Sequence, residues 1–296
     1  MNSSAEKPSV TVCIPTIGTS PFIDATLASV KAAWTDGLEL VLLDNGCEPP
    51  VERNLLARHG LAGRIARLDS RLPIAQSWNF ALHTARGLWL HLLHDDDWVD
   101  PGFYRTLLST LQIHADLGVW FCSTSNEFIS SRMPLRSASQ VKGGVVRDED
   151  TIGRVLFEQN ATRCVGTVIN TAVARNAGGF DETMKHHLDA EFFWRCACLA
   201  GAFFEPAPLG HYRIHTASLT SFKGQRRRQS IIEDGRLRHD AEHLLAKYGG
   251  QRPGDAFVRR FACGVLAGLY RYHLHRLQLS RAFSVWQLAN RHHVRL

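Results

Sequence analysis

The sequence predicts an α/β protein whose core is a mostly parallel, Rossmann-like sheet flanked by helices. Two observations support this fold class. In the first hundred residues, short runs of β-branched and apolar residues alternate with segments of helical period, as in βαβ units. The run at residues 38–43 is almost continuously apolar, as expected of a strand buried on both faces. A chain of 296 residues with 45% hydrophobic composition suffices for one large domain and a smaller appendage.

The first part of the chain contains the predicted sheet elements in alternating order. Strands are expected at residues 10–14, 38–43, 65–68, 88–93 and 118–123. A Ser-Pro pair at 20–21 and an Asp-Pro pair at 100–101 each predict the start of a helix, because a short polar residue caps the N-terminus and proline suits the first turn. Residues 74–86 have helical period and end at a glycine.

The second part is less regular. Residues 124–150 are polar and predict a loop or hairpin insertion. Extended segments are then expected at 164–169 and 203–214, a turn at 178–182 and an amphipathic helix at 188–199. Beyond residue 225 helical patterns dominate, interrupted by glycine and proline within 249–254.

Charge divides the chain into two regions. Residues 223–296 carry 15 Lys and Arg against 5 Asp and Glu, a net charge of +10, whereas residues 1–222 carry 19 against 23, a net charge of −4. We therefore expect an α/β domain at 1–222 and a basic helical extension at 223–296.

Membrane-spanning and disulfide-based classes are not expected. The amino terminus is polar, and the apolar run at 261–270 has only ten residues, against roughly 20 for a spanning helix. The seven cysteines are odd in number and include no Cys-x-x-Cys pair, which favours a reduced, cytoplasmic compartment and argues against zinc binding.

Acidic residues follow two of the predicted strands. Asp44 comes after the second strand, and Asp95, Asp96 and Asp97 come after the fourth. Ligands of parallel α/β sheets bind at the carboxyl ends of strands, and adjacent carboxylates repel one another unless a cation neutralises them. Hard oxygen ligands suit Mg²⁺ or Mn²⁺, which completes its shell with substrate phosphates. A solvated acidic loop and an ordinary Asp-Asn-Gly turn are the structural alternatives.

A set of segments within residues 8–222 resembles, in order and spacing, family 2 of the inverting nucleotide-sugar glycosyltransferases, which have the GT-A fold. The segments are VTVCIPT, LELVLLDNG, LHDDDWVDP, GGFDE followed by LDAEFFWR, and HYRIHTASLTS. The resemblance implies a sheet of GT-A type and a nucleotide-sugar donor. It does not specify the sugar, the base or the acceptor.

The resemblance also implies donor and metal positions. Pro15-Thr16 and Asp44 match positions that hold the nucleotide base and ribose. Residues 94–97 match the D-x-D-D motif of the family, and His94 stands where the first acid is usual. This leaves Asp95 as a contact of the ribose or sugar. Asp96 is then the best candidate metal ligand. Asp97 is its neighbour on the metal or the donor sugar.

Further positions are implied on the acceptor side and in the late loop. Asp189 matches the acid that the family uses as catalytic base, whereas Leu188 replaces the acid before it. From the residues alone, Asp189 is a charge at a helix N-terminus, and His186-His187 are solvated. Arg213 or His215 matches a loop that contacts the diphosphate or metal, although a lone histidine is as often structural.

The sequence thus predicts a glycosyltransferase dependent on Mg²⁺ or Mn²⁺ that transfers a sugar, with inversion, from a nucleoside diphosphate to a saccharide or lipid-linked acceptor in surface polysaccharide synthesis. A sugar-phosphate nucleotidyltransferase is an alternative, but residues 15–19 lack the basic side chains of its phosphate loop. A non-catalytic scaffold that binds membrane or nucleic acid through the carboxy-terminal region is another.

The carboxy-terminal region has two interpretations. Apolar residues at 257, 261, 265 and 269 alternate with arginines, as on a helix with one core face and one solvated face. The charge of +10 also favours an interfacial helix on anionic lipid, which would place the enzyme on the inner face of the membrane. Nucleic acid explains the charge equally well but not the three aspartates, and no nucleic-acid partner is expected.

Overall fold

The computed structural model describes residues 9–128, 142–158, 163–215, 228–248 and 255–296. Within these residues nine strands form one sheet in the order β3-β2-β1-β4-β8-β6-β9-β5, and β7 also pairs with β9. The strands are β1 (Val10–Thr16), β2 (Leu38–Asp44), β3 (Arg64–Arg67), β4 (Trp89–Leu92), β5 (Trp98–Val99), β6 (Val119–Phe128), β7 (Gly144–Val146), β8 (Thr167–Asn170) and β9 (Ala202–Ile214). Strands β3, β2, β1 and β4 are mutually parallel, as are β6 and β9, whereas β5, β7 and β8 run antiparallel to their neighbours. The predicted fold class is confirmed.

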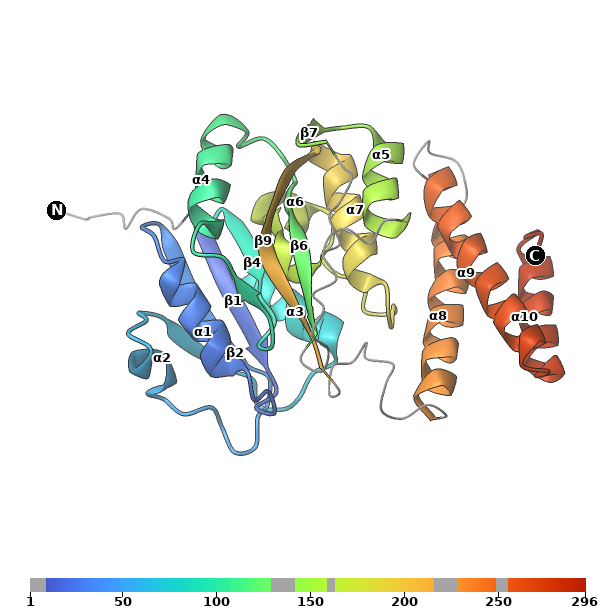
Figure 1. Ribbon diagram of the computed structural model, residues 1–296, viewed down its shortest axis with the longest axis horizontal. Coiled ribbons are helices and arrows are strands. Elements are labelled where there is room, and N and C mark those ends of the chain that lie inside the picture. Colours follow the sequence, from blue (N-terminus) through green and yellow to red (C-terminus); the bar gives the residue numbers. More distant parts are fainter. Residues whose placement is uncertain (1–8, 129–141, 159–162, 216–227, 249–254) are drawn as a thin grey trace.

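Helices cover both faces of the sheet (Figure 1). They are α1 (Ile23–Ala32), α2 (Leu55–Arg58), α3 (Ile74–Thr84), α4 (Phe103–Ile113), α5 (Glu149–Gly153), α6 (Thr171–Asn176), α7 (Leu188–Ala200), α8 (Arg228–Lys247), α9 (Asp255–His275) and α10 (Leu279–Arg291). One core contains buried residues of α1, α2 and α4. The other contains buried residues of α3, α6 and α7 together with α8, α9 and α10. The sheet is therefore the central layer between two apolar cores.

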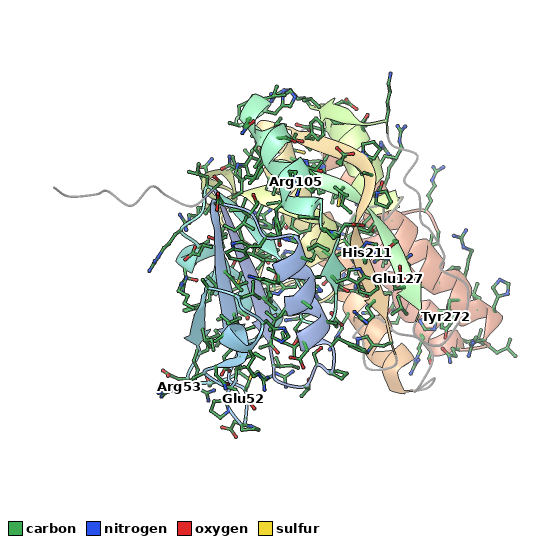
Figure 2. The ribbon with its side chains drawn as sticks, turned by 60° about the vertical axis from the view of Figure 1, so that its left-hand side comes forward. Glu52, Arg53, Arg105, Glu127, His211 and Tyr272 are labelled. Carbon is green, nitrogen blue, oxygen red and sulfur yellow. The ribbon has the colours of Figure 1, made fainter. Side chains whose placement is uncertain are left out.

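The strand after residue 118 differs from its prediction. β6 continues to Phe128 in parallel pairing with β9, so the start of the expected irregular segment 124–150 is a strand. Ser123, Thr124 and Ser125 are polar, yet they are buried in the sheet. Figure 2 shows Glu127 of β6 beside His211 of β9, and their side chains are 3.6 Å apart. Residues 129–141 of the expected loop lie outside the described residues.

Two other segments differ from their predictions. β7 lies within the segment 124–150 that was expected to be a loop or hairpin, and α5 begins at its end, at Glu149. The extended segment expected at 164–169 begins with a short 3₁₀ turn, Cys164–Gly166, before β8. Both errors arise from short elements, whose few residues show no period.

The carboxy-terminal helices pack on the rest of the molecule. Phe257 and Leu269 of α9 are buried, and Phe261 and Val265 pack against the same core. The apolar face that α9 was expected to have is therefore a core face. The expected boundary at 222/223 and the glycines and proline at 249–254 lie outside the described residues, so the division into two domains stays a prediction. In the described part of the chain, every helix is too short or too polar to cross a bilayer.

Candidate active site

The candidate site lies where the strand order of the sheet reverses. The chain adds β2 and β3 on one side of β1 and then crosses to β4 on the other, which creates a topological switch point between β1 and β4. In the pairing register, Thr16 at the end of β1 lies beside Asp44 at the end of β2. Leu93, which follows β4, donates its N–H to the carbonyl of Cys13 in β1. The acidic residues after β2 and β4 are thereby brought to one edge.

Thr16 and Asp95 join the ends of β1 and β4. The Thr16 hydroxyl donates a 2.5 Å hydrogen bond to Asp95 Oδ2 and accepts the N–H of Gly18. Ser20 Oγ donates to the carbonyl of Asp95 at 2.8 Å. Burial raises the pKa of the Asp95 carboxyl above its ordinary value, partly offset by the hydrogen bond from Thr16. The structure thus brings together two of the expected donor contacts, with Pro15 next to them in β1.

Asp97 is fully buried, and only one of its two carboxylate oxygens is hydrogen-bonded. Oδ1 accepts the backbone N–H of Arg213 at 2.8 Å, and the Asp97 carbonyl accepts the Thr26 hydroxyl at 2.7 Å. Oδ2 has no hydrogen-bond partner among the described residues. Burial raises the pKa of the carboxyl well above its ordinary value, and the neighbouring charge of Asp96 adds to this effect. The charges of Arg213 and Arg163 oppose this shift without outweighing it, so a further cation at Oδ2 would favour the ionised carboxylate.

His94, Asp96 and Asp97 form a group of potential ligand atoms that all lie within 4.8 Å of one another. The His94 ring stacks on Trp78, with centroids 5.4 Å apart, and its buried Nε2 lacks a hydrogen-bond partner in the described part of the chain. Unpaired buried polar atoms are costly. An imidazole nitrogen beside two carboxylates is a donor set that fits a divalent cation, and Mn²⁺ accepts such ligands.

This group differs from the expected ligand set in one residue. His215 was expected with Asp96 and Asp97, and its Nε2 lies 2.9 Å from Asp96 Oδ2. The three-residue group contains His94 instead. The signal for His94 was its place at the first position of the D-x-D-D motif. Arg163, whose guanidinium lies 4.7 Å over the Tyr212 ring and whose charge acts on Asp97, was missed because no pattern marks it.

Arg213 contacts two of the three consecutive aspartates at 95–97, here called the triplet. Its Nε donates to the carbonyl of Asp96 at 2.7 Å. Its guanidinium lies 4.4 Å from the ring centroid of Phe22 and 4.5 Å from that of Trp98. Contacts on both faces fix the guanidinium next to the carboxylates.

Asp44 is buried and already engaged by three donors. The backbone N–H groups of Cys47 and Val51 donate to it at 2.7 and 3.1 Å, and Arg67 Nη1 donates at 2.7 Å. Burial opposes ionisation, but these hydrogen bonds lower the pKa of Asp44 below its ordinary value. The Cys47 side chain also lowers this pKa through a hydrogen bond, so the roughly four acceptor positions of the carboxylate are largely occupied within the protein.

The turn after Asp44 requires glycine. Gly46 has a φ of +65°, and a Cβ there would lie 2.4 Å from the backbone nitrogen of Arg71. A side chain at this position would be strained by the backbone conformation and would also clash. The turn predicted from Asp44-Asn45-Gly46 is therefore present, and it closes the β2 side of the site.

Asp189 lies in the first turn of α7, next to Cys164. Its Oδ2 is 3.8 Å from Cys164 Sγ. Burial raises the pKa of this thiol well above its ordinary value, and the charges of both Asp189 and Asp97 add to the effect. One buried thiol thus lies close to both carboxylates. The expected buried face of α7, Phe192, Phe193 and Cys196, is confirmed.

The prediction that His186 and His187, just before α7, are solvated is wrong for His187. His187 is largely buried, and burial lowers the pKa of its imidazole to about 4, with the neighbouring His186 acting in the same direction. Its ring packs edge-on to Phe261 of α9, with centroids 5.0 Å apart. Asp240 of α8, which has no exposed surface, accepts the backbone N–H groups of Lys185, His186 and His187 at 2.7–2.8 Å. A carboxylate on α8 therefore fixes the entry to the helix that carries Asp189.

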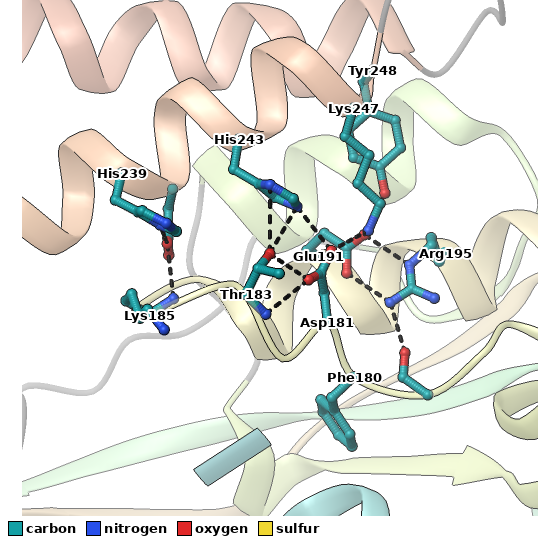
Figure 3. A network of polar contacts seen from close by, with 12 residues as sticks. Phe180, Asp181, Thr183, Lys185, Glu191, Arg195, His239, His243, Lys247 and Tyr248 are labelled. Carbon is teal, nitrogen blue, oxygen red and sulfur yellow. Dashed lines mark hydrogen bonds and ion pairs between the residues drawn. The ribbon is translucent and has the colours of Figure 1, made fainter. Parts of the chain in front are cut away.

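A second set of contacts holds α7 to α8 (Figure 3). Buried Glu191 accepts from Arg195 Nε at 2.7 Å, from Lys247 Nζ at 2.9 Å and from the Tyr248 hydroxyl. Lys247 also pairs with Asp181 at 2.6 Å. The charges are thus satisfied in one network, which makes α8 part of the support of α7.

Replacing Glu191 with glutamine is expected to lower the free energy of unfolding by roughly 3 kcal/mol, because the largely buried Arg195 loses its carboxylate partner, whereas Lys247 keeps Asp181. Burial opposes ionisation of Glu191, but Arg195 and Lys247 lower its pKa below the ordinary 4.5. A group whose pKa is lowered by folding stabilises the protein above its unfolded pKa and loses this contribution as the pH falls through the folded value.

Urea unfolding of wild type and Glu191→Gln at pH 7 and below about pH 4 measures both effects. The difference between the two proteins should shrink on acidification. The matched control is Glu182→Gln, an exposed neighbour that bonds to Asn79. A difference that stays constant with pH contradicts the assignment.

The comparisons with known proteins agree with this geometry. Residues 11–185 match the family described as Glycosyl transferase family 2. EpsH of Bacillus subtilis, itself named only provisionally as a glycosyltransferase, is 23% identical over 243 residues, which cover 78% of this chain and 67% of EpsH.

Solved structures show the same fold. The crystal structure of S. aureus TarS 1-349 superposes with a TM-score of 0.61 at 14% identity, covering 89% of this chain and 73% of that one. TarS 1-349 in complex with UDP-GlcNAc gives a TM-score of 0.62 at 15% identity over 87% of this chain and 71% of that one. The mannosyltransferase PcManGT from Pyrobaculum calidifontis, in complex with GDP-Man and Mn²⁺, gives 0.57 at 15% identity over 95% of this chain and 81% of that one. The family match covers more than half of the chain, and the expected family is confirmed. The chain belongs to glycosyl transferase family 2 and is a glycosyltransferase.

Proposed function

We propose that this enzyme is a metal-dependent inverting glycosyltransferase that uses a nucleoside-diphosphate sugar. The observation that carries the proposal is the group of His94, Asp96 and Asp97 at the switch point of the sheet, where His94 Nδ1 lies 3.8 Å from Asp97 Oδ2 and that buried oxygen has no hydrogen-bond partner among the described residues. Mg²⁺ or Mn²⁺ bound there would offset the charge of the two phosphates and of the leaving group. The structure of PcManGT in complex with GDP-Man and Mn²⁺ supports the choice of a divalent cation.

The donor would lie along the edge formed by β2, β1 and β4. Pro15, Thr16 and Asp44 are proposed to contact the base and ribose, and Asp95 the ribose or sugar. Arg213 would then be near the diphosphate, and His215 would reach the metal or phosphate through Asp96. UDP-GlcNAc with TarS and GDP-Man with PcManGT support a nucleotide-sugar donor but do not choose the base.

Asp189 is proposed as the catalytic base. It takes the proton of the acceptor hydroxyl as that oxygen attacks C1 of the sugar from the face opposite the nucleotide. The C1–oxygen bond to the diphosphate breaks as the new bond forms, and the leaving diphosphate keeps the electron pair. One displacement inverts the anomeric centre. The partly exposed place of Asp189 in the first turn of α7, beside the Cys164 thiol on which the charge of Asp97 also acts, supports a role next to the donor site.

The acceptor is proposed to be a saccharide or lipid-linked saccharide in surface polysaccharide synthesis. Such acceptors are assembled at the cytoplasmic face of a membrane. The basic region 223–296 gives the enzyme a route to an anionic surface of this kind.

A panel of nucleotide sugars, tested with Mn²⁺, with Mg²⁺ and with EDTA, tests the function. Metal-dependent release of a nucleoside diphosphate from one donor is expected, and proton NMR of the transferred sugar should show the inverted anomer. Nucleotide release that is equal in EDTA, or a product with retained configuration, contradicts the proposal.

The role of His94 is open to a spectroscopic test. With Mn²⁺ and inorganic pyrophosphate, which contains no nitrogen, pulsed electron paramagnetic resonance is expected to show ¹⁴N modulation from an imidazole ligand. His94→Asp should still bind Mn²⁺, because carboxylates suit this ion, but should lose the modulation. His215→Asn is the matched control, and loss of the signal in that variant instead would assign the nitrogen to His215.

A further inference from the structure

An exposed apolar surface lies at the carboxy-terminal end of the molecule. Of the twelve large apolar side chains that are exposed in the described part of the chain, six fall between residues 272 and 286. These six residues, here called the apolar face, are Tyr272, Leu274, Leu277, Leu279, Phe283 and Trp286. Single exposed apolar residues are ordinary, but six of them within fifteen residues of the chain, two with their rings stacked, mark a candidate interaction site.

The geometry of α10 shows that this face is additional to the core face. Ala282, Val285, Leu288 and Ala289 are buried against the rest of the molecule. Leu279, Phe283 and Trp286 follow a second stripe at spacings of four and three residues, and 65%, 55% and 43% of their surfaces are exposed. The rings of Phe283 and Trp286 stack with centroids 5.5 Å apart. The helix is therefore apolar on two sides, and packing within the chain uses one of them.

The turn between α9 and α10 presents leucine where a polar residue is usual. Leu277 is 82% exposed and has a φ of +55°. Asparagine and glycine adopt this left-handed conformation far more readily. A leucine here is unfavourable both for the backbone and for solvation.

The segment that carries the apolar face is basic. Residues 256–296 contain seven arginines and no aspartate or glutamate. Arg276 lies 5.1 Å over the ring of Tyr272, and Arg281 is in the first turn of α10. A second copy of this chain would bring like charges together, and nucleic acid would leave the leucines and aromatic rings in water. An anionic lipid surface satisfies both the charge and the apolar side chains.

The position of the face also suits a membrane. Figure 1 shows α10 as the outermost helix at the end away from the amino terminus, with the turn from α9 at the same end of the view as the carboxyl end of β1. Figure 2 shows Tyr272 on these helices.

We propose that the apolar face and its arginines dock the enzyme on an anionic lipid bilayer, with Leu277, Leu279, Phe283 and Trp286 in the headgroup region. The inference deepens the proposed function by locating a lipid-linked acceptor at this surface, and it rests on that function for the acceptor alone. Docking itself follows from the apolar residues and the charge.

Co-sedimentation of the full-length protein with vesicles tests the proposal. Binding to an equal mixture of phosphatidylcholine and phosphatidylglycerol is expected, with little binding to phosphatidylcholine alone. Each of Arg276→Gln and Arg281→Gln should weaken partitioning roughly fivefold. Leu277→Asn should weaken it about tenfold, the factor given by burial of one leucine, without loss of thermal stability because the backbone conformation suits asparagine.

Phe283→Ser combined with Trp286→Ser should abolish detectable binding, whereas Leu199→Ser, an equally exposed leucine on α7, is the matched control and should bind as wild type. Equal binding to both vesicle types, binding to neither, or unchanged binding of Leu277→Asn overturns the proposal. So does a concentration-dependent dimer, or retention on duplex DNA, that the double variant loses. Metal-dependent donor hydrolysis by the double variant should be unchanged, so failure of docking is distinguishable from failure of the proposed function.

Discussion

Replacing Asp189 with asparagine is expected to reduce the rate of sugar transfer by about 10²- to 10⁴-fold, the usual contribution of a positioned general base. Asparagine keeps the size of the side chain and an oxygen to accept the N–H of Ala190, which now bonds to Asp189 Oδ1 at 2.8 Å. The donor is proposed to bind at the edge of β1, β2 and β4. Its dissociation constant should therefore barely change.

Measurement of kcat together with the donor Kd separates this role from a structural one. If Asp189 were only a charge at the helix N-terminus, its removal would cost less than about 1 kcal/mol of stability and would leave turnover nearly normal. Glu182→Gln is the matched control, since it removes an exposed carboxylate from the same acceptor-side segment. A kcat near that of wild type removes Asp189 from the mechanism.

Replacing Asp96 with alanine is expected to abolish the metal-dependent part of nucleotide affinity. Asp96 is a member of the His94, Asp96 and Asp97 group, and without it two adjacent carboxylates, Asp95 and Asp97, would face the diphosphate. The fold should survive, because the Asp96 side chain is 23% exposed and its carbonyl, which holds Arg213, is unaffected.

Titration calorimetry of UDP and of GDP, with Mn²⁺ and with EDTA, checks this expectation. Wild type should bind one of them much more tightly with Mn²⁺, and Asp96→Ala should bind equally in both conditions. Asp100→Asn is the matched control, because it removes a carboxylate that pairs with His211 rather than facing the group. If wild type shows the same affinity with Mn²⁺ and with EDTA, the metal assignment is wrong.

The sequence predicted the sheet because its strands are apolar where both faces are buried, as in residues 38–43. It failed for β6 beyond Ser123, because Thr124 and Ser125 are polar and their burial depends on pairing with β9, more than 75 residues away in the chain. Hydrophobic period cannot detect a buried polar strand.

In the candidate site too, local sequence predicted some residues, whereas contacts with distant parts of the chain could not be predicted. Asp44 and the triplet were found because they follow strands that end at one edge of the sheet. The contribution of Asp240 was not predictable, since three N–H groups at 185–187 meet a carboxylate on a helix about fifty residues later. Nothing in the local pattern of α8 distinguishes this aspartate from a solvated one.

The hydrogen bonds from the N–H groups of residues 185–187 to Asp240 limit where segments of this enzyme can be exchanged with those of its relatives. The family match ends at residue 185, whose N–H group is the first of the three that donate to Asp240. A chimera joined at that boundary would take residue 185 from one parent and residues 186, 187 and Asp240 from the other, so one of the three donors to a buried carboxylate would depend on a foreign turn. A chimera designed to exchange acceptor preference should therefore take the turn at 178–187, α7 and α8 from the same parent.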